Sequence, residues 1–281
     1  MAELVEVLAA SHGPLIARDW PKVLPAHKER LTAAFQALGA RLNRAQADVL
    51  VVVSPDHWVN FFMDNLPSVC IGVGEEHEGP PEPFLKDFPW RPVPGHPGLA
   101  NHLHETALAN EFEPSVSHRM VLDHGFCIPL WRMNPDPLPK IVPVVVNTLE
   151  PPMPRVGRCL AWGKLLAKAI ASYPEKIRVA VLATGGLSHS IGEATMGAID
   201  EGFDRDCIKA FENGSEKPLV EFLERGMSAA GNGSHECRNW VVAHGAAGSR
   251  GFELVDYLAV PEVYVGCGFA AWRLGAPRAG I

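Results

Sequence analysis

Histidines that follow short apolar runs are the residues of this chain best suited to chemistry. His12, His57 and His189 each end such a run, in the segments Ser-His-Gly-Pro, Ser-Pro-Asp-His and Thr-Gly-Gly-Leu-Ser-His. In an open α/β sheet, ligands bind outside the carboxyl ends of the strands, where parallel strands end together. We therefore expect these three imidazoles to meet at one rim of a sheet.

Two histidines and one carboxylate on one face of a metal ion leave open positions for substrate and oxygen, an arrangement that favours non-haem Fe(II). With zinc, two histidines and one glutamate would instead activate water for hydrolysis. Composition does not choose between these metals. The carboxylates predicted near loops are Asp56, Asp123 and Glu236. Asp56 is placed to orient His57, Asp123 to orient a fourth candidate, His124, and Glu236 stands at an expected helix start, where an anion is favoured.

Other mechanisms find little support in the sequence. It has no G-x-S-x-G elbow, no P-loop and no G-x-G-x-x-G opening a helix after a strand. His235-Glu236 is not part of an H-E-x-x-H motif, because Asn239 stands where the second histidine would be. Cys127 follows His124 closely, but free cysteines are usually buried hydrophobes. The six cysteines form no C-x-x-C pair and indicate reduced thiols.

Composition narrows the class of protein. A chain of 281 residues suits one large domain with a sizeable core. The formal charge of -7 and the lack of a basic run argue against nucleic acid or an anionic membrane as partner. No apolar stretch approaches the roughly 20 residues that cross a bilayer, and the N-terminus lacks the basic start of a signal peptide. We expect a cytoplasmic protein.

The elements that must position the histidines follow from periodicity. Apolar runs predict strands at 5–9, 49–53, 69–73, 141–146, 177–183, 254–260 and 263–265. Helical spacing predicts helices at 24–42, 97–110, 156–172, 204–213 and 219–225, and a further helix capped by Ser234. A short run at 116–121 leads to Asp123-His124-Gly125. The alternation of strands and helices predicts an α/β fold.

Glycine and proline are over-represented, with 26 and 25 residues, and part of this excess forms the turns before the histidines. Residues 74–98 are rich in both and predict a long loop that acts as a lid or rim. We interpret this segment as an excursion from a single domain that spans residues 1–281. Pro143 predicts that the strand at 141–146 lies near a sheet edge.

At this point the residues resemble a known family, the class III (LigB-type) extradiol ring-cleavage dioxygenases. This family includes the catalytic subunit of protocatechuate 4,5-dioxygenase and gallate dioxygenase. The resemblance spans nearly the whole chain and rests on five segments in the family's order: Ser11-His12-Gly13-Pro14, Ser54-Pro55-Asp56-His57, Asp123-His124-Gly125, Thr184 to His189, and Glu236 to Trp240.

The resemblance implies that His12, His57 and Glu236 bind Fe(II). It implies that His189 is the acid/base and that His124 lies beside the bound catecholate and oxygen. It also implies a central mixed, mostly parallel sheet flanked by helices, with the site at the carboxyl ends of its strands. The expected assembly is a homo-oligomer, or a heteromer with a small helical subunit of which this chain has no obvious counterpart.

The expected substrate is a carboxylated or substituted catechol of the protocatechuate or gallate kind, cleaved next to its diol by O2. Trp58, Phe61 and Phe62 follow His57 and are candidates for the ring pocket. Gly266-Cys-Gly268 is a candidate turn whose N–H groups would receive a carboxylate. A dihydroxypyridine or an aminophenol remains an alternative substrate. A metal-dependent hydrolase with the same ligands, or a non-catalytic relative, remains an alternative function.

Overall fold

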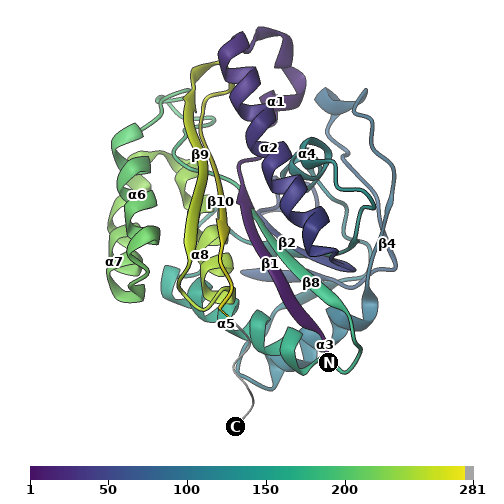
Figure 1. Cartoon of the computed structure of the whole chain (residues 1–281). Coiled ribbons are helices and arrows are strands. Elements are labelled where there is room, and N and C mark those ends of the chain that lie inside the picture. The colour runs from purple at the N-terminus through teal and green to yellow at the C-terminus, as the bar shows by residue number, and fades with distance from the viewer. Residues whose placement is uncertain (276–281) are drawn as a thin grey trace.

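A mixed eight-stranded sheet forms the centre of the protein (Figure 1), with strand order β6-β3-β7-β2-β8-β1-β10-β9. The structure is a computed structural model and describes residues 1–275. The strands of this sheet are β1 (Glu3–Ala10), β2 (Val49–Ser54), β3 (Val69–Gly72), β6 (Ser115–Ser117), β7 (Lys140–Val146), β8 (Arg178–Thr184), β9 (Phe252–Val260) and β10 (Val265–Trp272). A separate pair consists of β4 (Glu76–His77) and β5 (Val93–Pro94).

The four central strands explain where the histidines lie. β7, β2, β8 and β1 are parallel neighbours, so their carboxyl ends share one edge of the sheet. β3 pairs antiparallel with β7, and β10 pairs antiparallel with β1. The sheet is therefore mixed with a parallel centre, as the sequence and the resemblance predict, and the loops after β1, β2 and β8 emerge together.

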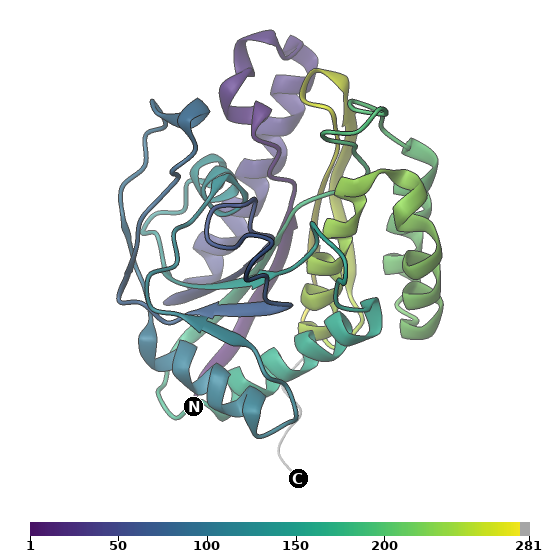
Figure 2. The same cartoon turned by 180° about the vertical axis from the view of Figure 1, so that it is seen from behind.

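Helices cover both faces of this sheet. The α-helices of the described residues are α1 (Leu15–Arg18), α2 (Pro25–Ala45), α3 (Pro97–Leu108), α4 (His124–Met133), α5 (Val156–Ser172), α6 (Glu201–Asn213), α7 (Glu216–Gly226) and α8 (Cys237–Ala246). α2 and α4 lie on the face turned toward the viewer in Figure 1, and α3, α5 and α8 lie on the face that Figure 2 shows. Buried strand residues alternate between two core clusters, with Val7 and Val51 on the α5 side and Leu8 and Val52 on the α2 side.

The structure differs from the sequence-based expectations at several places. β7 is an interior strand, and Pro143 is tolerated there because the pairing with β3 ends one residue away, at Val144. The run at 116–121 forms only the short strand β6, and His124 instead begins helix α4. The strand expected at 254–260 is confirmed as β9, whereas the strand expected at 263–265 begins only at Val265, after a 3₁₀ turn at Pro261–Val263, and continues as the longer strand β10.

The start of α8 also differs from the prediction. The hydroxyl of Ser234 donates to the carbonyls of Met227 and Gly231 and therefore does not cap a helix. Residues Asn232–Glu236 form a 3₁₀ turn (η4), and α8 begins at Cys237. Glu236 is thus the residue at which the chain enters α8.

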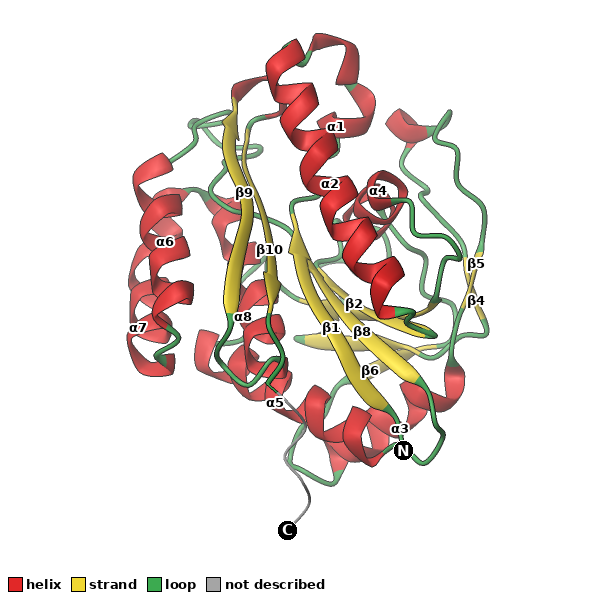
Figure 3. Ribbon diagram, viewed as in Figure 1, coloured by secondary structure: helices red, strands yellow, loops and turns green. Residues whose placement is uncertain are grey.

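The segment 74–98 contains β4, β5, a 3₁₀ turn at Pro83–Leu85 and the first two residues of α3, and its remainder is loop along one side of the molecule (Figure 3). Leu85 and Val93 are buried in the α2-side core, so part of the segment is firmly packed. Its role as a lid stays a prediction. Among residues 1–275, no helix is long and apolar enough to cross a membrane.

A close helix crossing sets the position of α8. A Cβ atom on Gly163 of α5 would clash with the backbone carbonyl of Val242 in α8. The two helices can approach this closely only because residue 163 has no side chain. Since Glu236 directly precedes α8, this crossing also places the carboxylate of the site.

We predict that Gly163→Ala lowers the free energy of unfolding by about 1–3 kcal/mol, the usual cost of overpacking a core. The matched control is Gly157→Ala in the same helix, where a Cβ would meet only Val220 Cγ1 at 3.8 Å. That change should be neutral or stabilising, because alanine favours helix more than glycine does. Denaturant unfolding of both variants checks this, and equal stability of the two would contradict it.

Candidate metal centre

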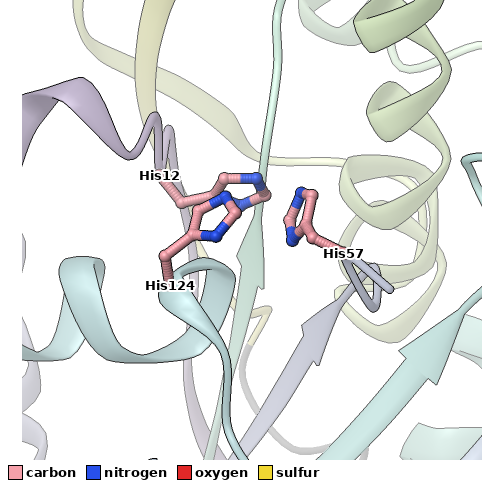
Figure 4. Close-up of side chains that lie close together, drawn as sticks. All are labelled: His12, His57 and His124. Atoms are coloured by element: carbon pink, nitrogen blue, oxygen red, sulfur yellow. The ribbon is translucent and has the colours of Figure 1, made fainter. Parts of the chain in front are cut away.

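Residues from five separate parts of the chain meet at the carboxyl edge of the sheet. His12 follows β1, His57 follows β2 and His189 follows β8, while Glu236 ends η4. His124 comes from the first turn of α4, and Figure 4 shows its ring directed toward those of His12 and His57. The structure thus brings together all five residues that the resemblance singles out.

One carboxylate oxygen lies at the centre of this group. Glu236 Oε1 is 3.4 Å from His12 Nε2, 3.5 Å from His57 Nε2 and 3.8 Å from His189 Nε2. Ring nitrogens of His12, His57 and His124 also lie within 4.8 Å of one another. Glu236 Oε2 accepts a hydrogen bond from the backbone N–H of Gly186 at 2.6 Å, which leaves Oε1 directed toward the imidazoles.

Each of the four imidazoles is held through Nδ1. His12 Nδ1 lies 3.1 Å from Thr184 Oγ1, and His189 Nδ1 lies 3.1 Å from the carbonyl of Leu187. The partners of the other two Nδ1 atoms are carboxylates, Asp123 at 2.9 Å from His57 and Glu82 at 2.7 Å from His124. A hydrogen bond at one ring nitrogen determines which nitrogen carries the proton, so Nε2 of each ring is left for the site.

The predicted partners of two histidines are wrong. Asp123 orients His57 rather than His124, because its Oδ2 accepts both the backbone N–H and Nδ1–H of His57. Asp56 does not orient His57; it accepts the backbone N–H groups of Val59, Asn60 and Phe61 and so shapes the turn that follows. Sequence adjacency suggested these pairs, whereas the folded backbone brings a residue 66 positions away to His57.

Burial and charge act in opposite directions on the pKa values here. Burial alone would lower the pKa of His57, but Asp123 and Glu236 outweigh it and raise that pKa to about 10. Burial lowers the pKa of His124 to about 4, and the neighbouring His57 adds to this effect. Burial also lowers the pKa of His189, partly opposed by Glu236. The imidazoles around Glu236 hold its pKa well below the usual range despite burial.

This donor set fits a divalent metal ion. Glu236 is 3% exposed, and within the described part of the chain its ion-pair partners are all histidines, so no lysine or arginine balances its charge. Two neighbouring ligands that each lie about 2.0–2.2 Å from a metal are separated by about 3–3.5 Å. The distances from Glu236 Oε1 to His12 and His57 match that separation. Two nitrogens and one carboxylate oxygen are ligands suited to iron or zinc.

Two functional features escaped the sequence analysis. Glu82 lies in the segment 74–98 and contacts His124 from 42 positions away, and no local motif marks it. Gly233 lies directly over the ring of His189, where a Cβ atom would clash with the imidazole. The loop before α8 therefore covers His189, and the glycine-rich stretch Ala-Gly-Asn-Gly at 230–233 was the only signal for this.

The predictions for the substrate pocket fare differently at its two groups of residues. Gly266 and Gly268 lie within strand β10, not in a turn, and their N–H groups donate to the Ser188 carbonyl and to Ser11 Oγ. The predicted carboxylate-binding turn is therefore wrong, because its donors are already used. Phe61 is half-buried against the α2-side core, and Trp58 is 39% exposed with a positive φ. Their place in a ring pocket stays a prediction.

The free cysteines of the chain are buried. The thiol of Cys127 donates to the carbonyl of Leu122, and burial raises its pKa well above the ordinary value. A thiol in this state is a poor nucleophile, which agrees with the low weight given to Cys127 in the sequence analysis.

Known proteins are similar to this chain in sequence. The chain is 32% identical over 163 residues to gallate dioxygenase of Pseudomonas putida, a match that covers 57% of this chain and 47% of that protein. The chain thus matches about half the length of this relative. It is 29% identical over 279 residues to 2,3-dihydroxyphenylpropionate/2,3-dihydroxicinnamic acid 1,2-dioxygenase of Paraburkholderia phymatum, over 81% of this chain and 85% of that protein.

The fold is also found in a solved structure. An uncharacterized protein, JW3007 from Escherichia coli K12, superposes with a TM-score of 0.65 and 18% identity, over 96% of this chain and all of that one. At this identity the likeness concerns the fold alone. The model of the LigB family, the catalytic LigB subunit of aromatic ring-opening dioxygenases, matches residues 6–268. This match spans every residue of the metal centre, and the chain belongs to the LigB family of aromatic ring-opening dioxygenases.

Proposed function

We propose that this protein is a non-haem Fe(II)-dependent extradiol dioxygenase that opens a catechol-type ring next to its two hydroxyl groups. The observation that carries the proposal is the convergence of His12 and His57 on Glu236 Oε1, with two further imidazoles beside them. Two histidines and one carboxylate leave open positions on iron that a diol and O2 can occupy together. A hydrolase does not bind O2 and would not need room for both.

His12, His57 and Glu236 would hold the metal. When bound, Fe(II) supplies a redox-active centre through which an electron-rich diol and O2 can exchange electrons. Asp123 fixes the ring of His57, and Thr184 fixes that of His12, so both Nε2 atoms face the same point as the carboxylate. Such partners of metal-binding histidines are the usual means of setting ring orientation.

His189 is the proposed acid/base. Its Nδ1 bonds the Leu187 carbonyl and its Nε2 faces the site, so Nε2 can accept the proton of a substrate hydroxyl. Because burial lowers its pKa, the imidazole is neutral at pH 7 and ready to act as a base. The same nitrogen can later return this proton as the O–O bond breaks. Both oxygen atoms of O2 enter a ring-opened, semialdehyde-type product.

A carboxylated or substituted diol is the proposed substrate class. The relatives named for gallate and for 2,3-dihydroxyphenylpropionate act on aromatic diols that carry a carboxylate. Since the backbone N–H groups of Gly266 and Gly268 in β10 are already hydrogen-bonded, another part of the site must recognise such a carboxylate.

The central experiment is anaerobic loading with Fe(II), followed by a panel of catechols, gallates, dihydroxypyridines and aminophenols. We expect oxygen uptake and a new absorbance of a ring-opened product to rise together with at least one diol. Loading with Zn(II) is the control, because zinc has no redox chemistry. Oxygen uptake with none of the panel, or equal turnover with zinc, would refute the dioxygenase proposal.

Removal of a ligand should reduce metal content. Glu236→Ala, His12→Ala and His57→Ala each leave fewer donors, and we expect substoichiometric iron by elemental analysis after the same loading. The matched control is Glu262→Ala, which removes the carboxylate of another Glu–His pair, with His27 at 3.0 Å, on the surface. Full iron occupancy in Glu236→Ala would show that the third ligand is a different residue.

Loss of the acid/base should separate turnover from metal binding. His189→Ala should keep its iron yet lose about 10²–10⁴-fold in turnover, the usual contribution of a general base. His102→Ala is the control, because His102 hydrogen-bonds Ser172 on the surface of α3. If His189→Ala instead lost iron while turnover per bound iron stayed the same, His189 would be a ligand.

The assembly is a further part of this proposal. The match to gallate dioxygenase covers 47% of that protein, so a larger functional unit is consistent with the family. We propose a homo-oligomer or a complex with a small helical subunit. Light scattering of the purified chain measures its mass directly, and a monomer fully active on its own would rule out both.

A further inference from the structure

His124 is held by a carboxylate from a distant segment. Glu82 Oε1 accepts the backbone N–H of His124 at 2.9 Å and lies 2.7 Å from its Nδ1. A single oxygen thus receives two donors of the same residue. This fixes both the start of α4 and the rotation of the imidazole, because any turn of the ring would break one of the two bonds.

The same arrangement occurs a second time in this site. Asp123 Oδ2 accepts the backbone N–H of His57 at 2.7 Å and lies 2.9 Å from its Nδ1. The rings of His57 and His124 lie side by side, with centroids 4.0 Å apart. Two neighbouring imidazoles are therefore each oriented by a carboxylate of their own, although only one of them is a proposed metal ligand.

Glu82 is unusual for a residue of a long loop. It is 9% exposed, and its second oxygen, Oε2, is buried without a hydrogen-bond partner among residues 1–275. A buried carboxylate costs free energy unless it is well bonded, so His124 is the contact that accounts for its burial. Segment 74–98 is fixed to the rest of the protein close to Glu82. The carbonyl of Glu78 accepts the backbone N–H of Leu122, and Leu85 is buried in the α2-side core.

From this geometry we infer that Glu82 is a positioning residue that keeps the hydrogen of neutral His124 on Nδ1, so that Nε2 presents its lone pair to the hydroxyl of an aromatic diol. The inference deepens the proposed function and depends on it for the effect on turnover, but not for the tautomer. A neutral imidazole has one donor and one acceptor nitrogen, and the hydrogen bond at Nδ1 decides which is which.

The position of the ring makes this choice matter. Nδ1 of His124 bonds Glu82, and the ring lies beside those of His57 and His12, with centroids 4.0 and 5.5 Å away. Without an acceptor at Nδ1, the ring would be free to carry its hydrogen on Nε2. A hydrogen there would face the site and could no longer accept one from the substrate. Glu82 therefore links segment 74–98 to the chemistry of the site.

The test compares Glu82→Ala with Glu82→Gln. Glutamine keeps an acceptor oxygen of the same reach, whereas alanine removes it. In the metal-free protein labelled with ¹⁵N-histidine, NMR should show His124 protonated on Nδ1 in the wild type and in Glu82→Gln, but on Nε2 or in exchange in Glu82→Ala. The resonance is assigned by its loss in His124→Gln.

The second measurement is turnover after Fe(II) loading. Glu82→Ala should lose about 10–100-fold, as is typical when a partner that orients a site histidine is removed, with unchanged iron content. Glu82→Gln should lose clearly less. Glu76→Ala is the control, because Glu76 is an exposed carboxylate in the same segment. Thermal unfolding of each variant shows that it is folded.

Either of two results would overturn the inference: Glu82→Ala keeps His124 protonated on Nδ1, or its tautomer changes while turnover equals that of the wild type. An equal loss in Glu82→Gln and Glu82→Ala would also overturn it, since the acceptor oxygen would then be irrelevant. If the tautomer changes as expected but wild-type protein turns over no diol, the proposed function fails while the positioning role of Glu82 stands.

Discussion

A buried carboxylate surrounded by imidazoles is the constraint on which this structure depends. Glu236 is 3% exposed, and the ion-pair partners it has in the described chain are histidines. Burying an unpaired charge is very costly, so the group is stable only if its neighbours carry a positive charge. His57, whose pKa is raised by Asp123 and Glu236, provides this charge in the free protein, and a divalent cation would provide it more strongly in the proposed holoenzyme.

The fold meets this constraint with a rigid frame. Parallel strands β1, β2 and β8 deliver three histidines to one edge of the sheet, and the close crossing of α5 and α8 places Glu236 opposite them. The rings of His12, His57 and His124 are then held at Nδ1 by distant residues, and the ring of His189 is held by the Leu187 carbonyl of its own loop. The reacting side of three of the four rings is thus set by tertiary contacts, whereas that of His189 is set within its own loop.

Carboxylates serve two different purposes in the site. Glu236 faces the metal position directly, whereas Asp123 and Glu82 lie behind His57 and His124 and orient them. The difference follows from geometry, because each of the latter two accepts a backbone N–H and an Nδ1–H of the same residue. In the proposed enzyme, this division allows one histidine to bind metal and its neighbour to contact substrate, although both are held in the same way.

The sequence by itself determined the α/β class, most helices and strands, and that His12, His57 and His189 meet at one edge of the sheet, whereas Glu236 was singled out by the family resemblance. It did so because apolar periodicity and strand–turn–histidine segments such as those ending at His12 and His189 are local patterns. Only the tertiary structure decided that Asp123 orients His57, that Glu82 orients His124, and that Gly268 lies inside a strand. These contacts depend on which distant parts of the chain come together in the fold, and the spacing of residues within one segment cannot predict them.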